Sequence, residues 1–174
     1  GISTAFNLLG PMANPAPIGS MLVGVAAPWM MRPMIEALGS RGVKSAWVVH
    51  GHGGVDEITL AGPCKVLSLS LGEITEFTVD AKDIGLDHAP LDAIRGGDAV
   101  ENAAIARSIL SGAPGAMRDT VVFNAAAALY VAGVAGDLRQ GRTLAEQSID
   151  SGAAGKVLDR LVDSSNRAAK RLDQ

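Results

Sequence analysis

Two neighbouring carboxylates, Asp56 and Glu57, close the segment HGHGGVDE at residues 50–57, which is the part of the sequence richest in possible chemistry. The segment directly follows the apolar run 45–50, which is typical of a buried strand. In open parallel sheets, ligands bind beyond the carboxyl ends of the strands. Neighbouring side chains of a regular strand point to opposite faces, but a loop bent at glycines can turn both carboxylates to one side. Since hard oxygen ligands suit Mg²⁺, which is completed by water and substrate phosphates, Asp56 and Glu57 are candidate magnesium ligands.

The same eight residues allow two other interpretations. His50 and His52 are a weak zinc signal, because no cysteine or third ligand accompanies them. A surface turn that carries two solvated acids explains the residues equally well.

Two further segments have possible binding roles. The sequence FNLLGPMANP at residues 6–15 bends sharply at Gly10 and Pro11, so it forms either a rigid pocket wall against a flat ligand or a structural linker. The sequence RGGD at residues 95–98 resembles a phosphate cradle before a helix, but Asp98 would place a negative charge where the phosphate sits. A capping box between Asp98 and Glu101 explains those residues better.

The elements that position these segments follow from the apolar periodicity. A strand, a helix and a strand at 21–26, 30–38 and 45–50 form a parallel βαβ unit, with Pro28 at the helix start and Gly39 at its end. Alternating runs at 64–69 and 74–79 predict a hairpin, and residues 80–94 an irregular connection. We expect an α/β fold with a mixed sheet, followed by about four helices, and a loose tail from residue 166. The helices are expected at 98–110, 117–132, 138 or 143 to 151, and 153–169.

Composition narrows the class of protein. Apolar residues make up 48% of the 174 residues and charged residues 19%, which excludes a disordered chain. A net charge of −3 without a basic run argues against nucleic-acid binding, and no apolar stretch reaches the roughly 20 residues of a membrane helix. The single Cys64 excludes an internal disulfide and fits a reducing compartment such as the cytoplasm; we expect it to be buried. The mean hydropathy of +0.24 indicates either helices on both sheet faces or an apolar surface for a partner.

Five ordered blocks resemble the anthranilate phosphoribosyltransferase family. The first block and the one that contains the two carboxylates are the most specific, and the likeness extends to about residue 161. The blocks are FNLLGP and NP (6–11, 14–15), VHG and GVDEI (49–51, 54–58), GGD and EN (96–98, 101–102), NAAAAL (124–129) and IDSGA (149–153).

The resemblance implies transfer of a phosphoribosyl group from phosphoribosyl pyrophosphate to the amine of anthranilate, a step of tryptophan biosynthesis. The family has a small helical N-terminal domain and a larger α/β domain related to pyrimidine nucleoside phosphorylases. Asp56 and Glu57 stand where the family binds Mg²⁺, which stabilises the departing pyrophosphate. Gly10 and Pro11 stand where the family lines the path of anthranilate.

The likeness also implies that residues 1–174 correspond to the C-terminal part of the α/β catalytic domain. The family's phosphate loop, its helical domain and the arginine that binds anthranilate would precede Gly1, and Ser3 stands where many members have arginine. We therefore expect an incomplete, inactive chain, which either self-associates through an exposed sheet edge or apolar face or rearranges its first segment around residues 6–17. A related phosphoribosyltransferase or a pyrimidine nucleoside phosphorylase is the alternative enzyme, and a non-catalytic folded or interaction fragment is the alternative without activity.

Overall fold

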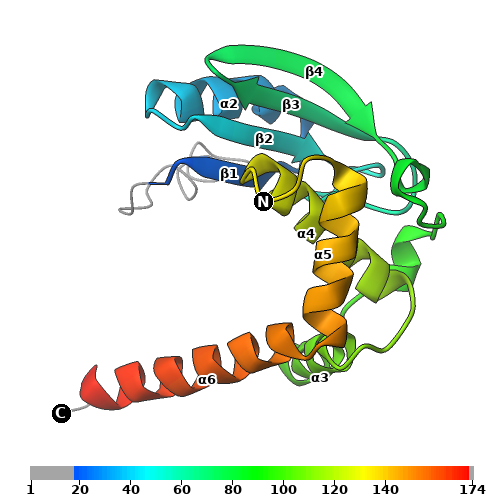
Figure 1. Cartoon of the computed structure of the whole chain (residues 1–174), viewed down its shortest axis with the longest axis vertical. Helices are drawn as coiled ribbons and strands as arrows, with labels where there is room; N and C mark the ends of the chain where they lie inside the picture. Colours follow the sequence, from blue (N-terminus) through cyan, green and yellow to red (C-terminus); the bar gives the residue numbers. More distant parts are fainter. Residues whose placement is uncertain (1–17, 173–174) are drawn as a thin grey trace.

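A four-stranded mixed sheet in the order β1-β2-β3-β4 organises the molecule, and the computed structural model describes residues 18–172 (Figure 1). β1 and β2 run parallel, whereas β2, β3 and β4 pair antiparallel. The predicted βαβ unit and hairpin are therefore confirmed. The strands are β1 (Ser20–Gly24), β2 (Ser45–His50), β3 (Cys64–Ser70) and β4 (Glu73–Val79).

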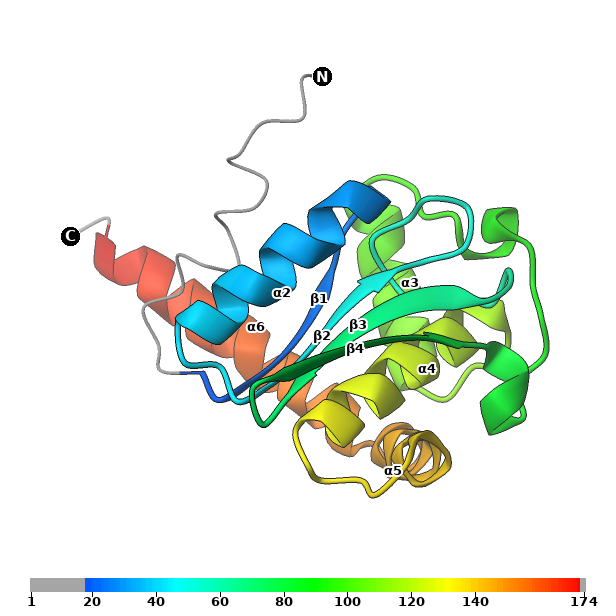
Figure 2. The same ribbon diagram turned by 90° about the horizontal axis from the view of Figure 1, so that it is seen from above.

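Helices cover both faces of the sheet, which is one of the two arrangements that the mean hydropathy indicated (Figure 2). On one face lies α2 (Met31–Ser40), whose Met34, Ile35 and Leu38 pack against Ala46 and Val48 of β2. On the other face α4 (Ala116–Val131) packs Phe123, Ala127 and Val131 against Trp47 and Val49, which alternate with the first pair along β2. Cys64 is fully buried in this second cluster, in agreement with its expected role as a small apolar residue.

The two ends of α2 lie close to their expected positions but not at them. A 3₁₀ turn, η1 (Pro28–Met30), places Pro28 at its first position and leaves Trp29 61% exposed. The helix then continues through Gly39, which was predicted to end it. It ends at Ser40 because Gly42, with φ of 84°, supplies the left-handed residue that follows a helix C-terminus.

The remaining helices form the C-terminal run that was predicted. They are α3 (Ala99–Leu110), α5 (Leu138–Asp150) and α6 (Ala153–Leu172), and two 3₁₀ turns, η2 (Ala81–Ile84) and η3 (Leu91–Ile94), lie in the connection expected to be irregular. α6 leaves the end of α5 and extends away from it (Figure 1). The expectation of a loose tail from residue 166 is wrong as far as Leu172, since residues 164–172 contain no glycine or proline to end the helix. Within the described residues, no helix is long and apolar enough to cross a membrane.

Candidate functional site

The loop that carries the two candidate carboxylates lies at the carboxyl ends of the parallel strands β1 and β2. The Gly51 N–H donates to the Val55 carbonyl at 2.9 Å, and the Gly54 N–H donates to the Gly51 carbonyl at 3.1 Å. These bonds close residues 51–55 into a tight loop, so Asp56 and Glu57 return to the end of the sheet directly after it. The loop therefore lies where ligands bind in sheets of this kind.

Two glycines let the backbone of the carboxylate pair lie against the strand ends. A Cβ atom at Gly24 would stand well inside 3.0 Å of the Asp56 carbonyl oxygen, and one at Gly51 would do the same to the Glu57 carbonyl oxygen. Real Cβ atoms essentially never approach so closely. The last residue of β1 and the residue that follows β2 thus each hold one residue of the pair through a contact that only glycine permits.

The two side chains form a like-charged pair at the surface. Both are exposed. The pKa of Glu57 is raised above its usual value, chiefly by partial burial and further by the negative charge of Asp56. Because a divalent cation would relieve this repulsion, and because both donors are hard oxygens, the pair fits Mg²⁺.

The described residues gather no larger set of metal ligands around the two carboxylates. Among residues 18–172, no three His, Cys, Asp or Glu side chains form a group that could hold a metal. His50 donates from Nδ1 to the Val25 carbonyl at 2.9 Å, and His52 packs against Gly62. Water and substrate phosphates commonly complete the coordination of a Mg²⁺ ion that one or two carboxylates hold.

A small cavity of about 170 Å³ adjoins Glu57 between η3, α3 and α4. Its walls are mainly the apolar side chains Ile94, Ile105, Met117 and Val121, which accounts for the partial burial that raises the pKa of Glu57.

Asn124 of α4 contacts the chain immediately after the carboxylate pair. Its Oδ1 accepts from the Ile58 N–H at 3.1 Å, and its Nδ2 donates to the carbonyls of Ile58 and Thr120 at 2.8 and 2.9 Å. No role for Asn124 was predicted from the sequence, although a single amide within the apolar run VVFNAAAAL was a visible signal.

The RGGD segment is a helix cap. The Asp98 carboxylate accepts from the N–H groups of Val100 and Glu101 at 2.8 and 2.9 Å, and Glu101 accepts from the Asp98 N–H at 3.0 Å. The predicted capping box is confirmed, and it occupies the helix end where a phosphate would have been held.

Gly10 and Pro11 lie outside the described residues, as does the whole of segment 6–15. Their part in lining the path of a substrate stays a prediction.

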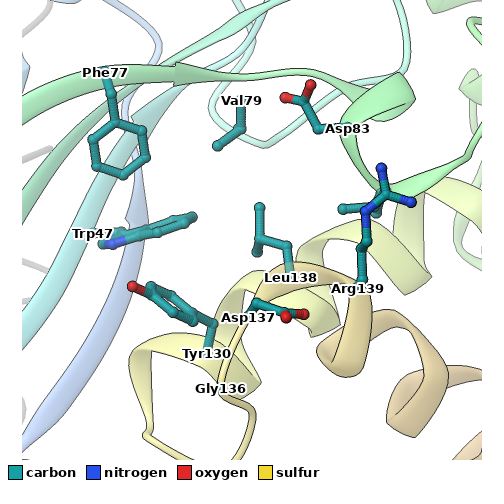
Figure 3. A pocket seen from close by; sticks show the side chains of 10 residues that line it. Trp47, Phe77, Val79, Asp83, Tyr130, Gly136, Asp137, Leu138 and Arg139 are labelled. Carbon is teal, nitrogen blue, oxygen red and sulfur yellow. The ribbon is translucent and has the colours of Figure 1, made fainter.

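A larger cavity, of about 420 Å³, lies at the far end of α4 and shares no lining residue with the cavity beside Glu57. Figure 3 shows Trp47 between Phe77 and Tyr130. The centroid of the Trp47 ring lies 5.3 Å from that of Phe77 and 5.2 Å from that of Tyr130. The two carboxylates that line this larger cavity already cap helices, because Asp83 accepts from the Asp80 N–H and Asp137 accepts from the Gln140 N–H. The candidate site is therefore the loop at the ends of β1 and β2.

Residues 1–155 match the model of a protein family described as "Glycosyl transferase family, a/b domain". The chain belongs to this family. It is 47% identical over 173 residues to the anthranilate phosphoribosyltransferase of Azorhizobium caulinodans, covering 99% of this chain and 50% of that protein. It is 50% identical over 168 residues to that of Rhizobium meliloti, covering 97% and 50%. The family resemblance found in the sequence is confirmed, and the chain spans about half the length of the curated relatives it matches.

Solved structures agree with this placement. The anthranilate phosphoribosyltransferase of Thermus thermophilus superposes with a TM-score of 0.85 at 40% identity, over 94% of this chain and 48% of that one. The Saccharomyces cerevisiae enzyme in complex with PRPP and Mg superposes with a TM-score of 0.84 at 26% identity, over 96% and 48%.

Proposed function

We propose that this chain supplies the magnesium-binding half of the catalytic domain of an anthranilate phosphoribosyltransferase. The observation that carries the proposal is the Asp56–Glu57 pair, set against Gly24 and Gly51 at the ends of two parallel strands. The structure of the Saccharomyces cerevisiae enzyme in complex with PRPP and Mg supports the same substrate and cation. In this reading the protein acts in tryptophan biosynthesis in the cytoplasm.

The reaction is a substitution at the anomeric carbon of phosphoribosyl pyrophosphate. The anthranilate nitrogen forms a bond to that carbon while the bond from carbon to the pyrophosphate oxygen breaks, and the nitrogen then loses a proton. Asp56 and Glu57 would hold the cation, and Gly10 and Pro11 would line the path of anthranilate. When bound, Mg²⁺ would supply positive charge to the departing pyrophosphate.

A chimera tests the assignment of the carboxylates. Residues 1–174 would replace the matching half of the Rhizobium meliloti relative, and turnover would be titrated with Mg²⁺. We expect Asp56→Asn with Glu57→Gln to lower turnover and weaken the dependence on Mg²⁺. Glu73→Gln with Glu76→Gln, two exposed acids of β4, makes the same change of charge elsewhere and is the matched control. An unchanged magnesium titration in the first variant would remove Asp56 and Glu57 from the proposal.

The substrate is tested in the same chimera. We expect product from anthranilate and phosphoribosyl pyrophosphate, and none from pyrimidine nucleosides with phosphate. Turnover of the nucleosides would instead support the related phosphorylase.

The chain by itself is expected to give no product with both substrates and Mg²⁺, because it spans only half the length of its relatives. Measurable turnover would show that these 174 residues are sufficient. We also expect self-association, since Val157 and Leu161 of α6 are 54% and 63% exposed and β1 is an edge strand of the sheet that the described residues form. If the sedimentation coefficient stayed at the value of a monomer at high protein concentration, self-association would be contradicted. If the chain associated but the chimera showed no turnover, the non-catalytic interaction fragment would be favoured.

A further inference from the structure

We propose that Asn124 is a positioning residue, which holds the Asp56–Glu57 pair in place for the cation through the peptide groups of Ile58. The inference rests on the proposed function, because it concerns the same carboxylates. It begins from the hydrogen bonds that Asn124 makes to Ile58, 66 residues away along the chain.

Hydrogen bonds hold the chain on both sides of the carboxylate pair, and we call these two points of attachment anchors. On its N-terminal side the chain is fixed by the bond from Gly51 N–H to the Val55 carbonyl, at 2.9 Å. On its C-terminal side Asn124 bonds both the N–H and the carbonyl of Ile58, at 3.1 and 2.8 Å. Only Asp56 and Glu57 lie between these anchors, so the anchors limit the freedom of their backbone together with the contacts at Gly24 and Gly51.

The second anchor depends on one side chain. Ile58 is fully buried, and its peptide groups face Asn124, whose amide pairs with them as the edge of a strand would. The third bond, from Asn124 Nδ2 to the Thr120 carbonyl at 2.9 Å, fixes the amide within α4. Asn124 therefore ties the loop to α4, and α4 is itself packed on the sheet through Phe123 and Ala127.

The physical consequence is a loss of preorganisation when this amide is removed. A buried peptide group without a partner is unfavourable, so the segment at Ile58 would shift to find water, and Glu57 would move with it. Side chains that orient metal ligands from one layer further out typically change metal affinity by about 10- to 100-fold when removed. Asn124 stands in that relation to the pair.

The test uses the 174-residue chain and Mn²⁺ alone as the probe, with free Mn²⁺ counted by electron paramagnetic resonance. We expect Asn124→Ala to weaken Mn²⁺ binding by about 10-fold or more. Ser45→Ala is the matched control, because Ser45 Oγ donates to the Val131 carbonyl at 2.9 Å and its loss thus removes a similar bond to the other end of α4. That control should leave Mn²⁺ affinity unchanged even where it lowers stability towards urea.

A second variant of Asn124 separates the effect of position from the effect of charge on Mn²⁺ binding, and it changes the side chain less than Asn124→Ala does. Asn124→Asp keeps the size of the side chain and the acceptor for the Ile58 N–H, but it loses both donated bonds and adds a negative charge. Electrostatics alone would make this variant bind Mn²⁺ more tightly, whereas loss of position makes it bind more weakly, and we expect weaker binding. Hydrogen exchange of the metal-free chain should be faster at residues 56–58 in both Asn124 variants and unchanged there in Ser45→Ala.

The outcomes distinguish this inference from the function on which it rests. If Asp56→Asn with Glu57→Gln abolishes Mn²⁺ binding while both Asn124 variants bind as the wild type does, the inference is wrong and the proposed metal site stands. If the wild-type chain and the chimera both bind no cation at these carboxylates, the proposed site fails and the inference fails with it.

Discussion

Replacing Gly24 by alanine tests the contact on which the geometry of the site depends. The Asp56 carbonyl oxygen lies where the new Cβ would stand, so the oxygen has to withdraw by more than about 1 Å to restore an ordinary contact. A displacement of about 1 Å at a reacting site can lower the rate by about 100-fold. Because Asp56 is exposed and the loop can move outward, we expect the loss of stability to stay near the lower end of the roughly 1–3 kcal/mol of an overpacked site.

The assay compares two quantities for the same variant. Turnover and its magnesium half-saturation are measured in the chimera, and the free energy of unfolding is measured in urea for the 174-residue chain. Gly19→Ala is the control, since no atom lies within 4 Å of a Cβ at that position just before β1. If Gly24→Ala kept turnover within about threefold of the wild type while folding normally, a misplacement of this size would have to be harmless, and the reasoning from loop position would be refuted.

Five further substitutions test packing, capping and charge. Gly141→Ala would place its Cβ 2.6 Å from the Ala126 carbonyl oxygen and should lower the free energy of unfolding by about 1–3 kcal/mol. Gly155→Ala has 3.7 Å to its nearest atom and should raise that free energy by up to about 1 kcal/mol. If urea unfolding showed both variants changing stability in the same direction, the close approach of α4 and α5 would be contradicted. Asp98→Ala should cost about 1 kcal/mol by circular dichroism melting and Asp98→Asn almost nothing, so equal losses would contradict the cap. Burial raises the pKa of Asp119, so its charge opposes folding above that pKa and the penalty disappears in acid; Asp119→Asn should raise the melting temperature at neutral pH only, and the same rise in acid would contradict this sign.

The local sequence was enough to predict most elements of the fold. A continuous apolar run, as at 45–50, indicates a strand buried on both faces, and alternation, as at 64–69, indicates a strand buried on one face. Both patterns can be recognised within a single segment. The boundaries were less predictable where two residues competed to end a helix. Gly39 is tolerated inside α2 because Gly42 provides the left-handed position, and the sequence holds both glycines without showing which one the chain uses.

The candidate site was predictable only in its exposed part. Asp56 and Glu57 stand out because their residue types carry the chemistry. The partners that hold them are contributed by distant segments, since Gly24 comes from another strand and Asn124 from a helix 66 residues beyond Ile58. A close approach of a backbone carbonyl to a glycine leaves no local pattern, so the fold has to be known before the role of Gly24 can be seen.

The unequal surroundings of the two tryptophans make their intrinsic fluorescence a probe of two different parts of the chain. Trp47 is 4% exposed between Phe77 and Tyr130, whereas Trp29 is 61% exposed beyond the end of β1. Their fluorescence should therefore separate by collisional quenching, with acrylamide dimming Trp29 first and Trp47 only once the core opens. Melting of the sheet and changes near the end of β1 can thus be followed in one cuvette, without any added label.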